Sequence, residues 1–298
     1  MRFSVWPGVA GAWEDLKDLG LYVESIGYDG LWVADHFMPN AEDNSGPTNE
    51  CWTTIAALAA AVPRVRIGTL VTGNTYRHPA VLAKMAATVD NISGGRLTLG
   101  LGAGWQENEH RAYGIEFSTL GGRMRRLEEA CKVIKGLLGD DRTNFAGKHY
   151  QLANAPLAPK PVQNPLPLLI GGGGEQKTLR IAATYADEWN VWGTPALLKH
   201  KMSILDKHCA DIGRDPKSIK RSAQAMLVLT DDKEVVERNR AAGRPVIAGN
   251  VGEVKAVIKE YQDAGLDEII IPDFNLGRGD RRKATYQQFM DEVVPEFR

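Results

Sequence analysis

The chain has few cysteines, and their arrangement excludes two classes of protein. Its 298 residues include only Cys51, Cys131 and Cys209, which are widely separated and form no CxxC pair. A small disulfide-bonded scaffold needs a dense set of cysteines, and a structural zinc site needs closely spaced pairs. We therefore expect reduced, structural thiols and a cytoplasmic location.

The sequence also lacks an excess of either charge and any long apolar run. Lys plus Arg number 36 and Asp plus Glu number 37, a balance that argues against nucleic acid or an anionic membrane as a partner. No apolar stretch approaches the roughly 18 residues of a membrane span. The first residues, MRFSVWPGV, do not resemble a secretory signal. We expect no nucleic acid and no membrane among the partners.

What the sequence does contain is a regular alternation of short apolar runs and amphipathic stretches. The apolar runs predict eight strands, at residues 2–6, 30–34, 66–71, 97–101, 168–170, 188–191, 223–229 and 268–272. The amphipathic stretches predict helices at residues 13–26, 51–62, 79–92, 122–138, 176–185, 195–212, 251–264 and 285–294. Strands that alternate with helices in this way form βαβ units and a parallel sheet.

The strand count predicts an α/β fold, a (β/α)₈ TIM barrel that forms a single domain over residues 1–298. A doubly wound open sheet would show the same alternation, but eight strands within one barrel length favour the barrel. Residues 139–167 are rich in proline, so we expect an excursion outside the barrel between the fourth helix and the fifth strand. In such barrels the chemistry lies on loops after the C-terminal ends of the strands.

A glycine-rich turn follows the fifth predicted strand and consists of Gly171, Gly172, Gly173 and Gly174. Four glycines let the backbone approach a ligand closely, and N–H groups at the start of a helix bind phosphate. The following Lys177 does not complete a P-loop, because Gln176 stands where that motif has glycine. We interpret this turn as a phosphate site, and the GLGAG segment at 100–104 as a second close approach to a ligand.

Two polar residues, Asp35 and His36, end the second predicted strand at the same edge of the barrel. A carboxylate beside an imidazole can orient a cofactor and supply general acid–base chemistry near neutral pH. A helix cap or a structural histidine is the alternative interpretation. Position at a strand end makes both residues catalytic candidates.

Metal and nucleophile motifs are missing. Glu107 and His110 have the helical spacing of a di-iron ligand pair, but the chain has no second copy and no HExxH motif. No serine lies in a GxSxG elbow. We therefore expect no metal and no covalent nucleophile.

Six segments carry a more specific pattern, namely GLWVADHF (30–37), RIGTLVTGNTYRHPAVLAK (66–84), GRLTLGLGAGWQENEHRAYG (95–114), GGRMRRLEEACKVIKGLL (121–138), PLPLLIGGGGEQKTLRIAATYADEWN (165–190) and GNVGEVKAVIKEYQDAGLDEIII (249–271). Together they resemble the bacterial luciferase-like family, and most of all its branch that uses coenzyme F420, a deazaflavin. The resemblance extends over almost the whole chain. It implies the same barrel, a homodimer, and a cofactor that lies across the C-terminal ends of the strands.

The resemblance also implies roles for individual residues. His36 would be the proton-handling group, with Asp35 beside it, and both would face the deazaflavin. A non-prolyl cis peptide at Leu70–Val71 would support the ring, and Asn108 would contact the cofactor. The cofactor-binding residues predicted in this way are Asp35, His36, Leu70, Val71, Thr72, Asn74, Gly102, Ala103, Asn108, Gly171, Gly172, Gly173, Gly174, Glu175 and Asn190.

Two positions depart from the sugar-phosphate dehydrogenases of this branch. Trp105 stands where they have a catalytic glutamate, and Asn40 stands where they have a tryptophan. We therefore do not expect glucose 6-phosphate as the substrate, and we predict a more apolar substrate pocket lined by Trp105, Asn40 and Trp192.

The resulting hypothesis is an F420-dependent oxidoreductase that transfers a hydride between the deazaflavin and a small organic substrate. One alternative is an FMN-dependent monooxygenase of the same family that uses a separate reductase. The other is an F420-binding protein without turnover. Both alternatives keep the same barrel and the same glycine turns.

Overall fold

The computed structural model describes residues 1–298 and contains a closed barrel of parallel strands. The barrel strands are β1 (Arg2–Trp6), β2 (Gly30–Val33), β3 (Arg66–Thr69), β5 (Leu97–Gly102), β8 (Leu168–Gly171), β9 (Glu188–Trp192), β10 (Lys220–Gln224) and β13 (Glu268–Pro272). They follow one another in the order β3, β2, β1, β13, β10, β9, β8, β5, and β3 pairs with β5 to close the ring. The predicted fold is confirmed.

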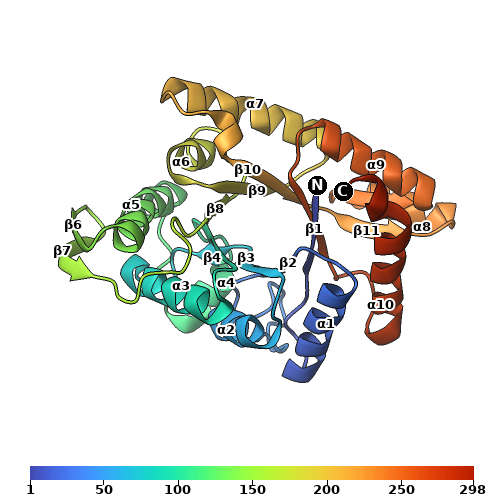
Figure 1. Cartoon of the computed structure of the whole chain (residues 1–298), viewed down its shortest axis with the longest axis horizontal. Coiled ribbons are helices and arrows are strands. Elements are labelled where there is room, and N and C mark those ends of the chain that lie inside the picture. Colours follow the sequence, from blue (N-terminus) through green and yellow to red (C-terminus); the bar gives the residue numbers. More distant parts are fainter.

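Helices surround the barrel (Figure 1). Those that cover it are α1 (Trp13–Ser25), α2 (Cys51–Ala61), α3 (Pro79–Ser93), α5 (Leu120–Gly139), α6 (Thr178–Tyr185), α7 (Pro195–Asp211), α9 (Val251–Asp263) and α10 (Gly279–Gln288). A short helix, α4 (Glu107–Tyr113), follows β5. The two termini lie together in Figure 1, and the amino group of Met1 donates a hydrogen bond of 2.8 Å to the carbonyl of Phe297.

An ionic cluster fills the barrel at the N-terminal ends of its strands. Arg66 pairs with Glu268 at 2.9 Å and with Glu188 at 2.5 Å, and Arg2 reaches Glu268 at 3.1 Å. The indole N–H of Trp32 donates to the same Glu268 at 3.0 Å. The two buried carboxylates are thus paired with partly exposed arginines at this end of the barrel, as buried charges require.

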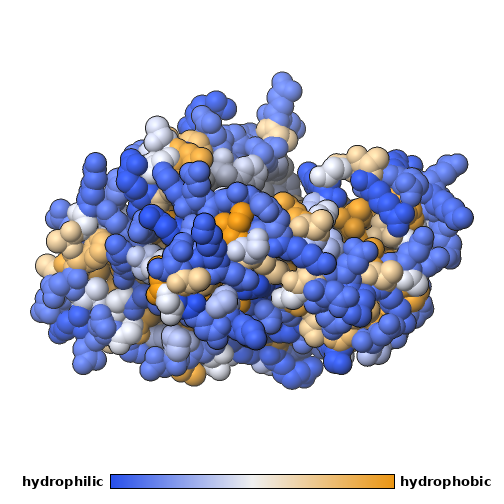
Figure 2. All heavy atoms as spheres, turned by 90° about the horizontal axis from the view of Figure 1, so that it is seen from above, coloured by the Kyte–Doolittle hydropathy of each residue, from blue (hydrophilic) through white to orange (hydrophobic).

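The hydrophobic core lies mainly between the barrel and the helices. It is one cluster of 64 buried residues that extends from Phe3 to Phe297. The face of α5 that the sequence pattern predicts is buried in it: Met124, Leu127, Ala130, Cys131 and Ile134. Outside the core the surface is largely hydrophilic, with hydrophobic side chains in separate patches (Figure 2). None of the helices combines the length and the apolar character that crossing a membrane would require.

The predicted excursion is present and contains an antiparallel hairpin of β6 (Arg142–Ala146) and β7 (Gln151–Pro156). The carboxylate of Glu129 on α5 accepts hydrogen bonds from the backbone N–H groups of Lys148, His149 and Tyr150. These bonds fasten the tip of the hairpin to the outside of the barrel.

The seventh strand differs from the prediction of one strand over 223–229. β10 ends at Gln224, and β11 (Met226–Leu229) leaves the barrel to pair with β12 (Val246–Gly249). The unpredicted helix α8 (Lys233–Ala241) connects β11 to β12. Hydrophobic periodicity does not show where an apolar run divides between two sheets, so it predicted one strand where the structure has two.

Two other boundaries also differ. The closing helix α10 begins at Gly279 rather than at 285, inside the basic run 278–283, and continues as a single π turn over Phe289–Val293. The third predicted strand stops at Thr69 and resumes as β4 (Thr72–Gly73) after an irregular step. That step lies at the site described next.

Candidate active site

A cavity of about 470 Å³ opens at the C-terminal ends of the barrel strands. Its volume is in the range of small-molecule and cofactor sites. The predicted site residues that line it are Asp35, His36, Leu70, Val71, Thr72, Gly102, Ala103, Trp105, Gly171, Gly172, Asn190 and Trp192. The predicted residues that do not line it are Asn40, Asn74, Asn108, Gly173, Gly174 and Glu175. The structure therefore brings most of the predicted site together in one place.

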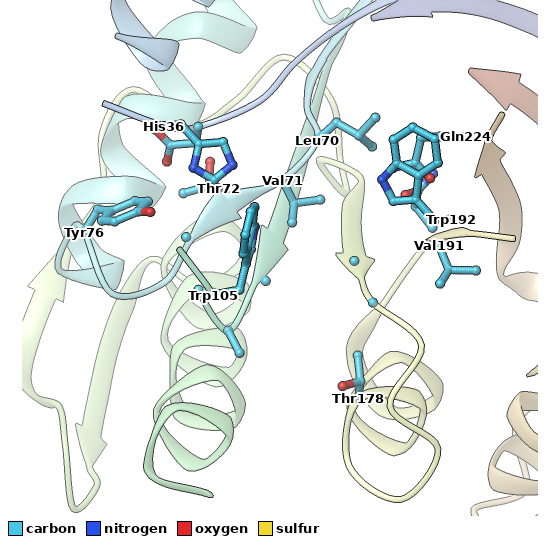
Figure 3. Close-up of a pocket in the computed structure, with 18 of the residues that line it drawn as sticks. His36, Leu70, Val71, Thr72, Tyr76, Trp105, Thr178, Val191, Trp192 and Gln224 are labelled. Atoms are coloured by element: carbon cyan, nitrogen blue, oxygen red, sulfur yellow. The ribbon is translucent and has the colours of Figure 1, made fainter. Parts of the chain in front are cut away.

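The floor of the cavity is a bulge between β3 and β4. The peptide bond between Leu70 and Val71 is cis, although Val71 is not a proline. The side chain of Val71 lies against two glycines of the neighbouring strands: an added Cβ at Gly102 or at Gly171 would come within 2.8 Å of its methyl groups. Glycine at both positions leaves Val71 room to project into the cavity, as Figure 3 shows. This cradle has the flat, apolar character that supports a ring system.

His36 is oriented by a carboxylate that the sequence analysis did not assign to the site. Nδ1 of His36 lies 2.9 Å from Oε1 of Glu109 on α4, and the other oxygen of Glu109 accepts the Phe37 N–H at 2.8 Å. The hydroxyl of Tyr76 also donates to Glu109. An ionised carboxylate can only accept, so the Nδ1 atom of His36 carries the proton and Nε2 is the atom left for a ligand.

Glu109 stays ionised although its side chain is fully buried. Burial acts to raise the pKa of Glu109, but hydrogen bonds from His36, from the Phe37 N–H and from Tyr76 hold it below its ordinary value. Burial and the same contact raise the pKa of Tyr76 far above its usual range, so Tyr76 remains a donor. The network thus fixes one tautomer of His36 at the cavity wall.

Asp35 has a different surrounding from the one expected for a proton-transfer group. Both of its oxygens accept from the guanidinium of Arg77, at 2.6 and 3.1 Å, and Arg77 also pairs with Glu50. Burial raises the pKa of Asp35, and the charge of Arg77 opposes that shift. Arg77 thus occupies both oxygens of Asp35. The catalytic role of Asp35 stays a prediction.

The four-glycine turn contributes its first half to the cavity. Gly171 and Gly172 line it, and Gly172 has a φ of 117°, which a side chain would strain. Gly173 and Gly174 do not line it, and helix α6 begins at Thr178, which also lines the cavity, instead of at 176. The N–H of Gly172 donates to the carbonyl of Asn190 at 2.9 Å, so only the N–H groups after Gly172, at the start of the helix, would suit a phosphate.

Glu175, predicted as a cofactor contact, lies outside the cavity. Its carboxylate pairs with Lys201 at 2.6 Å and with His200 at 3.0 Å. These partners hold it on the surface between α6 and α7. The side chain of a residue just after a glycine turn can point toward the cavity or away from it. Closeness in sequence to the lining glycines therefore did not predict the position of the Glu175 side chain.

Three asparagines predicted near the ligand also lie outside the cavity. Asn40 is exposed on the loop after β2. The amide of Asn108 donates to the carbonyl of Pro39 at 2.9 Å and so ties that loop to α4. Asn74 is buried and donates to the hydroxyl of Tyr150 at 3.2 Å. Asn108 and Asn74 therefore support the frame of the site, and Asn40 does not help to form the pocket.

The sequence analysis missed other residues of the cavity, chiefly Trp6, Tyr76 and Gln224. Trp6 ends β1, so the rule that strand ends carry the site could have found it. Gln224 ends β10, but a strand predicted through 229 concealed that end. Glu109 lies about one helical turn after the glycine segment, and no sequence motif marks it as a residue of the site.

His110, which has the Glu-x-x-His spacing noted in the sequence, has a partner at each ring nitrogen. Its Nδ1 lies 2.7 Å from the carbonyl of Gln106, and its Nε2 lies 2.7 Å from the hydroxyl of Thr75. His110 therefore has two protein partners and no free nitrogen. The chain brings no group of three or more His, Cys, Asp or Glu side chains together for a metal ion.

Comparison with known proteins agrees with this geometry. The sequence profile of the family described as luciferase-like monooxygenase matches residues 1–292. The chain belongs to this luciferase-like family. A relative described as F420-dependent glucose-6-phosphate dehydrogenase, from Amycolatopsis mediterranei (strain U-32), is 29% identical over 95% of this chain and 94% of its own. One described as F420-dependent hydroxymycolic acid dehydrogenase, from Mycobacterium tuberculosis (strain ATCC 25618 / H37Rv), is 30% identical over 70% of this chain and 58% of its own.

Solved structures share the whole barrel of this luciferase-like chain. A coenzyme F420-dependent tetrahydromethanopterin reductase from Methanopyrus kandleri superposes with a TM-score of 0.84 at 18% identity and covers 100% of this chain and 99% of its own. An F420-dependent secondary alcohol dehydrogenase, solved with an F420–acetone adduct, has a TM-score of 0.84 at 23% identity with the same coverage. At such identities the likeness concerns the fold.

Proposed function

We propose that this protein is an F420-dependent oxidoreductase acting on a small organic substrate. The observation that carries the proposal is the His36 imidazole, fixed by Glu109 at the wall of a cavity whose floor is the cradle of Val71, Gly102 and Gly171. The names of the relatives support F420 as the cofactor. The cradle is the part of this chain that would hold its ring, and the backbone N–H groups after Gly172, at the start of α6, would hold its phosphate.

When bound, F420 supplies a carbon that accepts or donates a hydride. The chain supplies the proton site: in alcohol oxidation the substrate hydroxyl proton passes to Nε2 of His36, and in carbonyl reduction it returns from there. Glu109 stabilises the imidazolium that forms, because its carboxylate faces Nδ1 at 2.9 Å. Trp105 and Trp192 at the rim exclude water from the reacting groups.

The test of this proposal is a titration of the purified protein with F420 and, separately, with FMN, followed by tryptophan fluorescence. Trp6, Trp105 and Trp192 line the cavity, so a bound ring quenches them. We expect saturable quenching by F420 in the micromolar range or tighter, roughly −8 kcal/mol. Preference for FMN, with oxygen consumption when reduced FMN is supplied, would make the protein an FMN-dependent monooxygenase instead.

A matched pair of glycine variants controls for unspecific quenching. Gly171→Ala places a Cβ within 2.8 Å of Val71 and disturbs the cradle, whereas Gly139→Ala at the end of α5 meets no atom within 4 Å. We expect Gly171→Ala to weaken F420 binding by about 5-fold or more, the order of an overpacking cost, and Gly139→Ala to leave it unchanged. Equal binding by both variants would place the cofactor elsewhere.

Two further expectations belong to this proposal: a homodimer, which the family resemblance implies, and a cytoplasmic location, which the cysteine content indicates. The even charge balance and the buried, unpaired thiols are compatible with a cytoplasmic enzyme. Light scattering on the purified protein tests the first expectation, and fractionation of the source cell tests the second. A monomer in solution would contradict the expected homodimer and would leave the proposed redox function unaffected.

A further inference from the structure

One polar side chain of the cavity has no partner within the protein. Gln224 ends β10, lines the cavity and is 5% exposed, and its Oε1 atom accepts no hydrogen bond. A buried amide oxygen without a partner lowers the stability of a fold, and such groups are rare in native proteins. Other buried polar atoms of the chain also lack a partner, but among their residues only Gln224 lines the cavity, where a ligand can supply one.

The surroundings of Gln224 are aromatic. Trp192 on β9 is its register partner, so the two side chains point to the same face of the sheet, and Figure 3 shows them side by side. The ring of Trp192 lies 5.8 Å from that of Trp6, which in turn contacts Phe274 at 5.0 Å in an edge-on arrangement. The amide thus lies in a wall formed largely by aromatic rings.

The cavity lining also lacks any lysine or arginine. Its titratable members are Asp35, His36 and Tyr76. Figure 3 shows His36 and Tyr76 on the opposite side of the cavity from Gln224. An anionic group placed against Trp192 and Gln224 would lose its hydration without gaining a cationic partner. This wall therefore selects against sugar phosphates and carboxylates.

We propose that Gln224 is the polar anchor for the substrate, and that the substrate is a neutral, largely apolar molecule with a hydroxyl or other neutral polar group that hydrogen-bonds to the side-chain amide of Gln224. Trp6 and Trp192 contact its apolar part. This proposal rests on the proposed function, because it assigns the wall across the cavity from His36 to the substrate. The cofactor is assigned to the cradle on β3, β5 and β8, where glycines replace side chains, and Gln224 lies on β10, which pairs with none of these strands.

The first experiment measures the unfolding temperature of variants of the whole protein, without any ligand. Gln224→Met keeps the shape of the side chain and removes the unpartnered amide, so we expect the midpoint to rise by about 2 °C or more, the shift that roughly 1 kcal/mol produces in a protein of this size. Gln106→Met is the matched control: Gln106 is 2% exposed, but its amide donates to the Met38 carbonyl at 2.9 Å. We expect that control to lower the midpoint.

The second experiment measures binding of cyclohexanol and of cyclohexanecarboxylate by saturation-transfer NMR, with F420 present at saturation. We expect the alcohol to bind the wild-type protein and the carboxylate not to bind. Gln224→Met should weaken the alcohol by about 3- to 10-fold, the value of one neutral hydrogen bond, and should leave the affinity for F420 unchanged.

The outcomes separate this inference from the proposed function. A lower midpoint for Gln224→Met would show that the amide is structural and would overturn the inference. Equal loss of F420 affinity in that variant would assign Gln224 to the cofactor, and would also overturn it while leaving the redox proposal intact. If F420 fails to bind the wild-type protein but cyclohexanol binding still depends on Gln224, the anchor stands and the proposed function is wrong.

Discussion

Two walls of the same cavity are built on opposite principles. On the wall formed by the loop after β2 and by α4, every charged group has a protein partner: His36 with Glu109, and Asp35 with Arg77. On the wall formed by β9, β10 and β1, the surface is aromatic and its buried amide, Gln224, is unpartnered. The polar groups of the first wall are held in position by protein contacts before a ligand binds, whereas the amide of the second wall finds its partner in the ligand.

The comparison indicates where the chain tolerates change. Polar groups that satisfy one another are coupled, so removing one leaves another buried and unpaired. Replacing a polar side chain whose partner is the ligand raises the stability of the fold and weakens ligand binding, which is the usual trade-off between stability and function. Variants of the two walls should therefore shift stability and activity in different directions.

The largest effect is expected for His36→Ala. Loss of the proton site should lower turnover by about 100- to 10,000-fold, the range for a general acid–base group, measured as F420 absorbance change with a substrate identified by screening. His149→Ala is the control, because His149 lies on the hairpin outside the barrel. Full turnover by the His36→Ala variant would exclude a catalytic role for His36.

Arg77→Met tests the coupled wall through stability. It leaves Asp35, which is 1% exposed, without a counter-charge. We expect a loss of about 3–5 kcal/mol in the free energy of unfolding, as for a buried pair deprived of one partner. Lys17→Met removes an exposed pair with Glu14 and should leave the free energy of unfolding nearly unchanged. Equal losses in urea titrations of the two variants would contradict this account of the wall.

Glu109→Gln is expected to reduce turnover by about 10- to 100-fold, because the carboxylate positions His36 without touching substrate. The same variant should show a pH signature in stability. The folded-state pKa of Glu109 is lowered, so the unfolded chain binds more protons, and the stabilisation is present above about pH 4.3 and lost as the pH falls through the folded pKa. The stability gap between wild type and Glu109→Gln should therefore shrink on acidification. A gap that is constant with pH would assign Glu109 a purely structural role.

The smallest effect is expected on the aromatic wall. Trp192→Leu removes the ring that faces Trp6 at 5.8 Å. We expect cyclohexanol to bind about 2- to 10-fold more weakly, since aromatic contacts of this kind are worth roughly 0.5–1.5 kcal/mol. Leu120→Ala, a change at an exposed rim residue, serves as the comparison. An unchanged affinity in Trp192→Leu would show that the substrate does not use this wall.

Prediction from the sequence worked where a pattern is local and repeated. Alternating apolar runs predicted the barrel strands, and glycines in runs predicted turns that now line the cavity. It failed where a short segment changes its partner, as at Gln224, where one apolar run belongs to the barrel and to the β11–β12 pair. It failed again at Glu175 and Asn40, which lie close in sequence to lining residues but whose side chains point away from the cavity.

The class of fold, the strand-end location of His36 and the glycines that make room for Val71 follow from the amino-acid sequence alone. They depend on periodicity and on backbone geometry, which are set by neighbouring residues. The contact of Glu109 with His36, the contact of Arg77 with Asp35 and the lack of a partner at Gln224 appear only in the folded chain. Such pairings join residues from different βα units, and their distances exist only after the ring of strands has closed.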